Sequence, residues 1–136
     1  MFMLMPLGSG EYPATGAKVR GLVLVVDGES LVRWALAASL STAGYDVVTA
    51  ANGADACAIA AKSPHPAVVL LDLRPDTHGQ TFLDQIKLAA PSCRVLVLTT
   101  ERRDGVPPGW LGAEAIEKPF DLAEVVRLVG EAVAAE

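Results

Sequence analysis

The sequence is poor in the residues that build metal, redox and nucleic-acid sites. Its 136 residues include two cysteines and two histidines, and neither type forms a cluster with metal-ligand or redox spacing. The formal net charge is -5 and no run of basic residues occurs, so we expect no nucleic-acid partner. The apolar residues 1–7 are too few to span a membrane and lack a signal-peptide pattern. We therefore expect reduced thiols, a cytoplasmic location and no membrane partner.

The first 18 residues lack the pattern of a folded element. The segment GSGEYPATGAK, residues 8–18, is rich in glycine and carries proline, serine and threonine, which is typical of a flexible segment. We expect residues 1–18 to be a flexible N-terminal arm and residues 19–136 to be one folded domain.

From residue 19 onward, short apolar runs alternate with segments of helical spacing. Helical patterns follow the first, second, third and fifth apolar runs, whereas Pro107, Pro108 and Gly109 favour a shortened or irregular helix after the fourth. This alternation predicts βαβ units, and therefore an α/β three-layer sandwich around a five-stranded parallel sheet. The five predicted strands are residues 19–26, 46–50, 67–72, 94–100 and 113–117.

Residues with useful chemistry stand at the ends of four predicted strands. Asp27 and Asp72 follow the first and third strands, Thr99 stands at the end of the fourth, and Lys118 follows the fifth. Because ligands of such sheets bind at the carboxyl ends of the strands, we expect these side chains to share one site. A carboxylate can attack phosphorus, while an ammonium and a hydroxyl can contact phosphoryl oxygens. The set therefore favours phosphoryl transfer.

Five segments carry a more specific pattern: VLVVDGESLVRWAL, GYDVVTAANGADA, VVLLDLRPDTHG, VLVLTT and EKPF. Together they resemble the receiver domain of bacterial two-component response regulators over residues 19–135. The resemblance implies a flavodoxin-like (CheY-like) fold with strand order 2-1-3-4-5. It also implies that Asp72 accepts a phosphoryl group from a sensor histidine kinase or a phosphotransfer protein, and that Thr99 and Lys118 contact this group.

The resemblance further implies a Mg²⁺ site formed by Asp27, Asp72 and the backbone carbonyl of Arg74. Family members usually carry two acidic residues where this chain has Asp27 and Gly28, and the missing one normally contacts the metal directly. Mg²⁺ tolerates several water ligands, so we expect weakened binding rather than none. Glu29 is a candidate replacement ligand, although an acidic first turn at a helix N-terminus is the simpler interpretation.

Two further departures from the family pattern leave alternatives open. The loop after Asp72 is one residue shorter than usual, and Ala115 replaces the usual Tyr or Phe whose rotation accompanies activation. The chain is therefore either a phosphorylatable receiver or a degenerate receiver that binds a partner without phosphorylation. The segment VVDGES also resembles the nucleophile strand of haloacid-dehalogenase-type phosphatases, which would make Asp27 the nucleophile, but no insertion is large enough for a cap.

The receiver resemblance implies a signalling protein rather than an enzyme, with at most phosphotransfer onto Asp72 and slow self-dephosphorylation. Its output would pass to an unknown downstream protein through surface contacts. Trp34 lies off the apolar stripe of the first helix, which in the family commonly docks against the kinase, so it is either a partner contact or part of the packed rim. Val126 and Val133 flank the apolar stripe of the last helix, where they either widen a homodimer face or are buried.

Overall fold

The structure is a computed structural model of the chain, and it describes residues 10–13, 19–72, 79–99 and 113–135. Six strands form one sheet in the order β1-β3-β2-β4-β5-β6. All neighbouring strands pair in parallel except β1, which runs antiparallel to β3. The strands are β1 Gly10–Tyr12, β2 Leu22–Asp27, β3 Asp46–Ala50, β4 Val68–Asp72, β5 Arg94–Thr99 and β6 Ala113–Glu117. The helices are α1 Ser30–Thr42, α2 Gly53–Ala60, α3 Gly79–Ala89 and α4 Leu122–Ala134.

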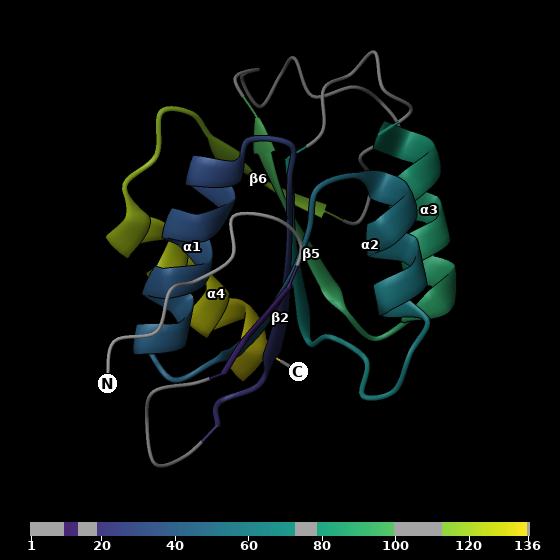
Figure 1. Cartoon of the computed structure of the whole chain (residues 1–136), viewed down its shortest axis with the longest axis horizontal. Helices are drawn as coiled ribbons and strands as arrows, with labels where there is room; N and C mark the ends of the chain where they lie inside the picture. Colours follow the sequence, from purple (N-terminus) through teal and green to yellow (C-terminus); the bar gives the residue numbers. More distant parts are fainter. Residues whose placement is uncertain (1–9, 14–18, 73–78, 100–112, 136) are drawn as a thin grey trace.

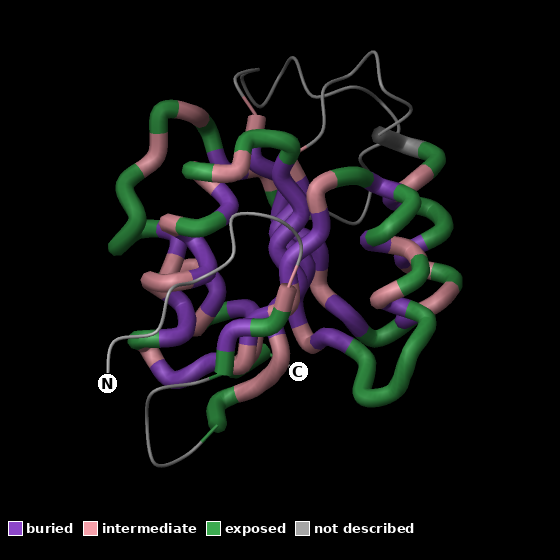
Figure 2. The backbone as a smooth tube through the Cα atoms, in the orientation of Figure 1, coloured by how far each residue is buried: buried purple, intermediate pink, exposed green. Residues whose placement is uncertain are grey.

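The sheet is the middle layer of a sandwich (Figure 1). Helices α1 and α4 cover one face, and α2 and α3 cover the other. Within the parallel part of the sheet, the order β3-β2-β4-β5-β6 is the expected 2-1-3-4-5 arrangement. The predicted α/β three-layer fold is confirmed, and Figure 2 shows its buried residues concentrated in the central strands.

The central strands are apolar because both of their faces are covered. In β2, Val23 and Val25 point into the core under α1 and α4, whereas Leu24 and Val26 point into the core under α2 and α3. All four side chains are fully buried. This alternation explains why the strand reads as a continuous apolar run rather than as an apolar-polar pattern.

The structure has one strand more than the five predicted, because part of the expected flexible arm belongs to the sheet. Gly10–Tyr12 pair with β3 as a sixth, edge strand, and Tyr12 is buried in the core beside α1. The aromatic ring supplies apolar burial that the Gly-rich composition of the segment conceals. The remaining arm residues, 1–9 and 14–18, and the expected irregular helix within residues 100–112 lie outside the described residues.

Helix α4 is amphipathic and begins directly after its N-cap residue, Asp121. The Asp121 carboxylate accepts a hydrogen bond from the amide of Ala123, as an N-cap does. Val126 and Val133 are partly buried and pack against the core, which is one of the two alternatives that the sequence leaves for them. In the part of the chain that the structure describes, no helix is long and apolar enough to cross a membrane.

Candidate functional site

The four predicted site residues stand at the carboxyl ends of neighbouring strands. Asp27 and Asp72 are direct partners in the β2–β4 register. Thr99 ends β5, and its carbonyl oxygen accepts a hydrogen bond of 2.7 Å from the backbone amide of Lys118, just after β6. Because the strands are parallel, these ends form one edge of the sheet, as the sequence predicts.

Lys118 reaches across the end of the sheet to Asp72. Its Nζ donates to Asp72 Oδ2 in a short ion pair. Strand β5 lies between β4 and β6, so the lysine side chain must extend past the end of β5 to make this contact. The two side chains are 26% and 16% exposed, and the pair is therefore shielded but still reachable from solvent. An ammonium group is thus already in place beside the carboxylate that would carry a phosphoryl group.

Asp27 is the most deeply buried acidic group of the site, with 2% exposure. Its Oδ1 accepts a 2.8 Å hydrogen bond from the Glu29 amide, whereas Oδ2 has no hydrogen-bond partner among the described residues. Burial is the main reason that the pKa of Asp27 rises from 3.8 to about 7, and repulsion by Asp72 adds to it. The Glu29 amide and the Lys118 charge lower the pKa and offset part of this rise. The pocket is therefore short of positive charge.

This deficit fits a divalent cation. Two adjacent carboxylates, one of them with an unpartnered buried oxygen, form a hard oxygen donor set of the kind that Mg²⁺ prefers. Yet no group of three Asp, Glu, His or Cys side chains comes together as a metal-binding cluster in the described residues. The donor set is consistent with Mg²⁺ but small, as expected for a pocket that has lost one carboxylate.

Neither of the other two predicted ligands adds a described carboxylate or carbonyl to the pair. Glu29 is the N-cap residue of α1 and is exposed, and its backbone amide donates a hydrogen bond to Asp27. Arg74 lies outside the described residues, so its carbonyl remains a prediction.

The backbone at residue 28 does not require glycine. Gly28 is exposed and does not have a positive φ. A Cβ added there would meet no atom closer than the carbonyl oxygen of Ala51, at 3.9 Å, which is ordinary contact. The glycine therefore removes a carboxylate without any conformational need for its own flexibility.

Arg33 is a site neighbour that the sequence reasoning missed. It is only 4% exposed, and its Nη1 donates to the backbone carbonyl of Asp27 at 2.5 Å. This bond ties the first turns of α1 to the end of β2. A signal existed in the sequence, because Arg33 lies at helical spacing from Ala37 and Leu40, which are buried on the same helix. Val32 is partly buried against the same core, so the buried face of α1 includes Arg33 in addition to the apolar residues.

Ala115 and Trp34 are two further residues that the sequence analysis considers, and the structure describes both. Ala115 is half-buried in β6, opposite Val97 of β5, so no aromatic ring stands at this point of the sheet. Trp34 is 39% exposed on α1, near the 70% exposed Leu31, which confirms the expected position off the buried stripe.

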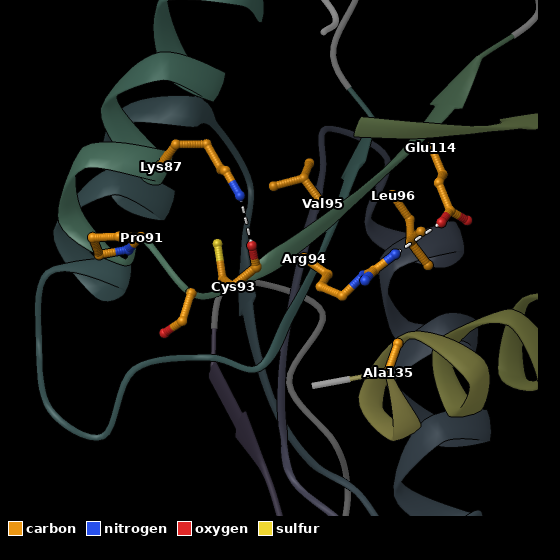
Figure 3. Close-up of a pocket in the computed structure, with 9 residues that line it drawn as sticks. Lys87, Pro91, Cys93, Arg94, Val95, Leu96, Glu114 and Ala135 are labelled. Atoms are coloured by element: carbon orange, nitrogen blue, oxygen red, sulfur yellow. Dashed lines mark hydrogen bonds and ion pairs between the residues drawn. The ribbon is translucent and has the colours of Figure 1, made fainter. Parts of the chain in front are cut away.

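A cavity of about 420 Å³ lies elsewhere (Figure 3). It opens beside Arg94, at the amino end of β5, whereas Thr99 marks the carboxyl end of the same strand. Its charged groups are already engaged, since Lys87 donates to the Cys93 carbonyl and Arg94 pairs with Glu114. The cavity is therefore separate from the acidic pocket.

The sequence has clear relatives. Residues 23–130 match the family model of the response regulator receiver domain. The DNA-binding transcriptional regulator NtrC of Escherichia coli (strain K12) is 39% identical over 119 residues, which make up 84% of this chain and 25% of that protein. Transcriptional regulatory protein KdpE of Mycobacterium tuberculosis (strain CDC 1551 / Oshkosh) is 40% identical over 116 residues, or 82% of this chain and 50% of that protein. The chain thus spans a quarter to a half of the length of these relatives.

Solved structures show the same architecture. The apo receiver domain of nitrogen regulatory protein C superposes with a TM-score of 0.73 at 38% identity, covering 85% of this chain and 96% of that one. Chemotaxis protein CheY4 of Vibrio cholerae also gives a TM-score of 0.73, at 28% identity, covering 85% of this chain and 99% of that one. The match to these structures therefore extends over nearly the whole of each.

Proposed function

Because the chain belongs to the response regulator receiver family, we propose that it accepts a phosphoryl group on Asp72 from a sensor histidine kinase or a phosphotransfer protein. One observation supports this most strongly: the Lys118 ammonium is paired with Asp72, beside the buried carboxylate of Asp27, at the carboxyl edge of the sheet. The donor is a phosphohistidine, and the product is an aspartyl phosphate on this chain.

The protein contributes one nucleophile to the transfer, and its other groups position and stabilise the phosphoryl group. A carboxylate oxygen of Asp72 attacks phosphorus, a P–O bond forms, and the P–N bond to the donor imidazole breaks as the imidazole leaves. Lys118 neutralises the charge that gathers on the phosphoryl oxygens, and the Thr99 hydroxyl hydrogen-bonds one of them. Asp72 attacks as its carboxylate, which lies in an ion pair with Lys118.

Mg²⁺ would be held by Asp27, Asp72 and the carbonyl of Arg74, with Glu29 as a weaker candidate. When bound, it supplies positive charge to the phosphoryl oxygens and to the buried carboxylates. We propose that it binds more weakly here than in a pocket with a full acidic pair, because Gly28 carries no side chain.

The output of such a domain passes through protein contacts, and the chain does not turn over a separate substrate. The named relatives NtrC and KdpE are transcriptional regulators, but this chain matches only a part of each. We propose an unidentified protein as the downstream partner. On the input side, exposed Trp34 and Leu31 of α1 are candidate contacts for the kinase.

A second candidate is a degenerate receiver that binds its partner without phosphorylation. It is favoured by Gly28, which leaves fewer than three clustered metal donors in the described residues, and by Ala115, which cannot act as a rotating aromatic switch. For such a module, Asp72→Asn would leave partner binding unchanged, whereas for a phosphorylatable receiver it would abolish the difference in partner binding caused by phosphodonor treatment.

Peptide mapping tests the assignment of the acceptor. After incubation with acetyl phosphate and Mg²⁺, we expect the phosphoryl group on the peptide that contains Asp72, and none in Asp72→Asn. Asp46→Asn is the matched control, because it makes the same chemical change at the amino end of β3. A phosphoryl group on Asp27 instead would overturn the receiver mechanism and favour a dehalogenase-type phosphatase.

A further inference from the structure

The outer edge of the sheet carries a second constructed site. We propose that the edge of β3, together with α1, forms a binding site for an extended peptide, and that residues 10–13 of this chain are its intramolecular ligand. These residues precede the family match, which begins at residue 23. The proposal is independent of phosphorylation on Asp72.

Backbone pairing gives this strand its affinity for the edge. Gly10, Glu11 and Tyr12 lie opposite Thr49, Val48 and Val47 in antiparallel register. In addition, the Gly10 amide donates to Thr49 Oγ1 at 2.8 Å, and the same hydroxyl donates to the Gly10 carbonyl at 3.3 Å. A strand added to an exposed sheet edge is a common form of peptide recognition.

Side-chain alternation gives the site its specificity. Glu11 is exposed, whereas Tyr12 is 2% exposed and packs in the core cluster with residues of α1 and β3, among them Leu40 and Val47. Alternate side chains of a strand point to opposite faces, so one peptide position is read and its neighbour is not. The site therefore selects an aromatic residue at the third position of the peptide.

The helix α1 holds the end of the ligand. The hydroxyl of Ser41, a residue with 1% exposure, donates to the carbonyl of Pro13 in a short hydrogen bond. Proline has no backbone N–H to continue the ladder, so the strand ends there. The buried hydroxyls of Thr49 and Ser41 thus hydrogen-bond the peptide backbone on either side of the buried Tyr12. The ligand is an extended segment in which an exposed residue is followed by a buried aromatic residue and then by proline.

Residues 10–13 occupy the peptide site of their own chain, and the N-terminal arm can therefore control access to that site. An unpaired strand edge attracts other strands, and β3 would be such an edge without residues 10–12. The arm is covalently attached, so its effective concentration keeps the site closed to competing peptides. The arm therefore reversibly blocks a peptide-binding site on β3. This strand lies two strands away from β4, which carries Asp72.

A peptide-exchange experiment on the full chain tests this. We expect a synthetic peptide of residues 8–13 to shift the amide resonances of Val48 and Thr49 in the Tyr12→Ala chain. Wild type should bind it at least about tenfold more weakly, because its own arm competes. Glu11→Ala is the matched control and should behave as wild type. A peptide with alanine in place of its tyrosine should not bind. Absence of peptide-induced shifts in a folded Tyr12→Ala chain would overturn the proposal.

Hydrogen exchange in the wild-type chain gives a test that needs no variant. If the strand is a removable ligand, the Gly10 amide should exchange by local opening, at least about tenfold faster than the amides of Val23–Val26 and with little dependence on denaturant. Exchange of Gly10 at the rate of the central strand, only on global unfolding, would show that β1 is an inseparable part of the core. That result would overturn the proposal even if Tyr12→Ala failed to fold.

Discussion

At the scale of single residues, the acidic pocket is defined by an imbalance of charge. Asp27 and Asp72 lie side by side, and Lys118 pairs with Asp72 alone among the described residues. Asp27 is left with an unpartnered oxygen and a pKa raised to about 7. Near neutral pH, Asp27 is thus poised between a protonated form that suits the metal-free pocket and an ionised form that suits a bound cation.

We predict that the metal-free protein loses stability as the pH rises through about 7. The folded-state pKa of Asp27 lies above the unfolded value of 3.8, so the folded state binds the proton more tightly. The resulting stabilisation is fully present below pH 3.8 and is lost as the pH rises through about 7. Asp27→Asn should therefore raise the free energy of unfolding at about pH 8 by roughly 1–4 kcal/mol without Mg²⁺, and should change it much less at about pH 5.

Urea unfolding with a chelator present, at both pH values, measures this difference. Asp46→Asn, at the other end of the sheet, controls for a general effect of the substitution type. An equal or greater loss of stability in Asp27→Asn at the higher pH would contradict the raised pKa and the charge deficit derived from it.

Gly28 gives a second prediction at this scale. Gly28→Asp should strengthen Mg²⁺ binding by at least about tenfold, because it adds a carboxylate to a donor set that is otherwise small. The structure has room for the side chain, since an added Cβ meets no atom closer than 3.9 Å. Calorimetric titration with Mg²⁺ measures the change.

Gly28→Ala is the control for that titration, because it adds the Cβ without a carboxylate. The alanine variant should match wild type within about twofold. Equal tightening in both variants would attribute the effect to a stiffer backbone rather than to a restored ligand.

At the residue scale, the sequence predicts the members of the site better than their environment. Asp27, Asp72, Thr99 and Lys118 could be placed because each stands at the end of an apolar run, and parallel strands bring such ends together. The burial of Asp27 and of Arg33 was harder to predict from the sequence. Arginine is usually exposed, so its place on a buried helical stripe overrides the expectation from residue type.

At the scale of elements, a glycine fixes how closely α2 approaches α3. Gly53 is the first residue of α2, and a Cβ added there would overlap the ring of Phe82 on α3. The two helices pack on the same face of the sheet, over a shared core that includes Ala56 and Ile86. The small residue therefore allows the aromatic ring to seat against the start of α2.

We predict that Gly53→Ala destabilises the domain by about 1–3 kcal/mol, through overpacking against Phe82. The sign of this change in the free energy of unfolding is informative, because alanine favours a helix over glycine by about 1 kcal/mol. A loss of stability therefore points to the overlap with Phe82. Phe82→Leu should relieve the overlap, so the double variant should lose less than the sum of the two single variants. Gly28→Ala is the neutral control, because its added methyl group makes only an ordinary contact, at 3.9 Å, with the carbonyl oxygen of Ala51.

Urea unfolding of the four variants and wild type provides the free energies. Additive losses in the double variant, or a Gly53→Ala protein more stable than wild type, would contradict the proposed contact between the start of α2 and the Phe82 ring.

Prediction of the elements from sequence succeeded where periodicity was long and failed where it was short. β3 and β6 were predicted at the bounds that the structure gives, and β2, β4 and β5 to within a few residues. β1 was missed because three residues cannot show a period and Gly10 belongs to a linker-like composition. The one available signal was Tyr12, a large aromatic residue followed directly by Pro13 in an otherwise small and polar segment.

At the scale of the whole molecule, the two functional features occupy different edges of one sheet. The acidic pocket lies at the carboxyl ends of the strands, and the peptide site runs along the outer side of β3. Helix α1 contacts both, since Arg33 near its start holds the Asp27 carbonyl and Ser41 near its end holds the Pro13 carbonyl. The fold could be predicted as a whole because each βαβ unit constrains the next, whereas a terminal strand stands outside that logic.

The central claim is that Asp72 is a working phosphoryl acceptor in a pocket with a reduced metal site. Intact mass after incubation with acetyl phosphate tests it most directly, for wild type, Asp72→Asn and Gly28→Asp, each with Mg²⁺ and with a chelator. We expect wild type to gain one phosphoryl group only when Mg²⁺ is present, Gly28→Asp to do so at lower Mg²⁺, and Asp72→Asn to gain none. A wild-type chain that stays unmodified at every Mg²⁺ concentration while Gly28→Asp is phosphorylated would contradict it, and would identify the protein as a binding module.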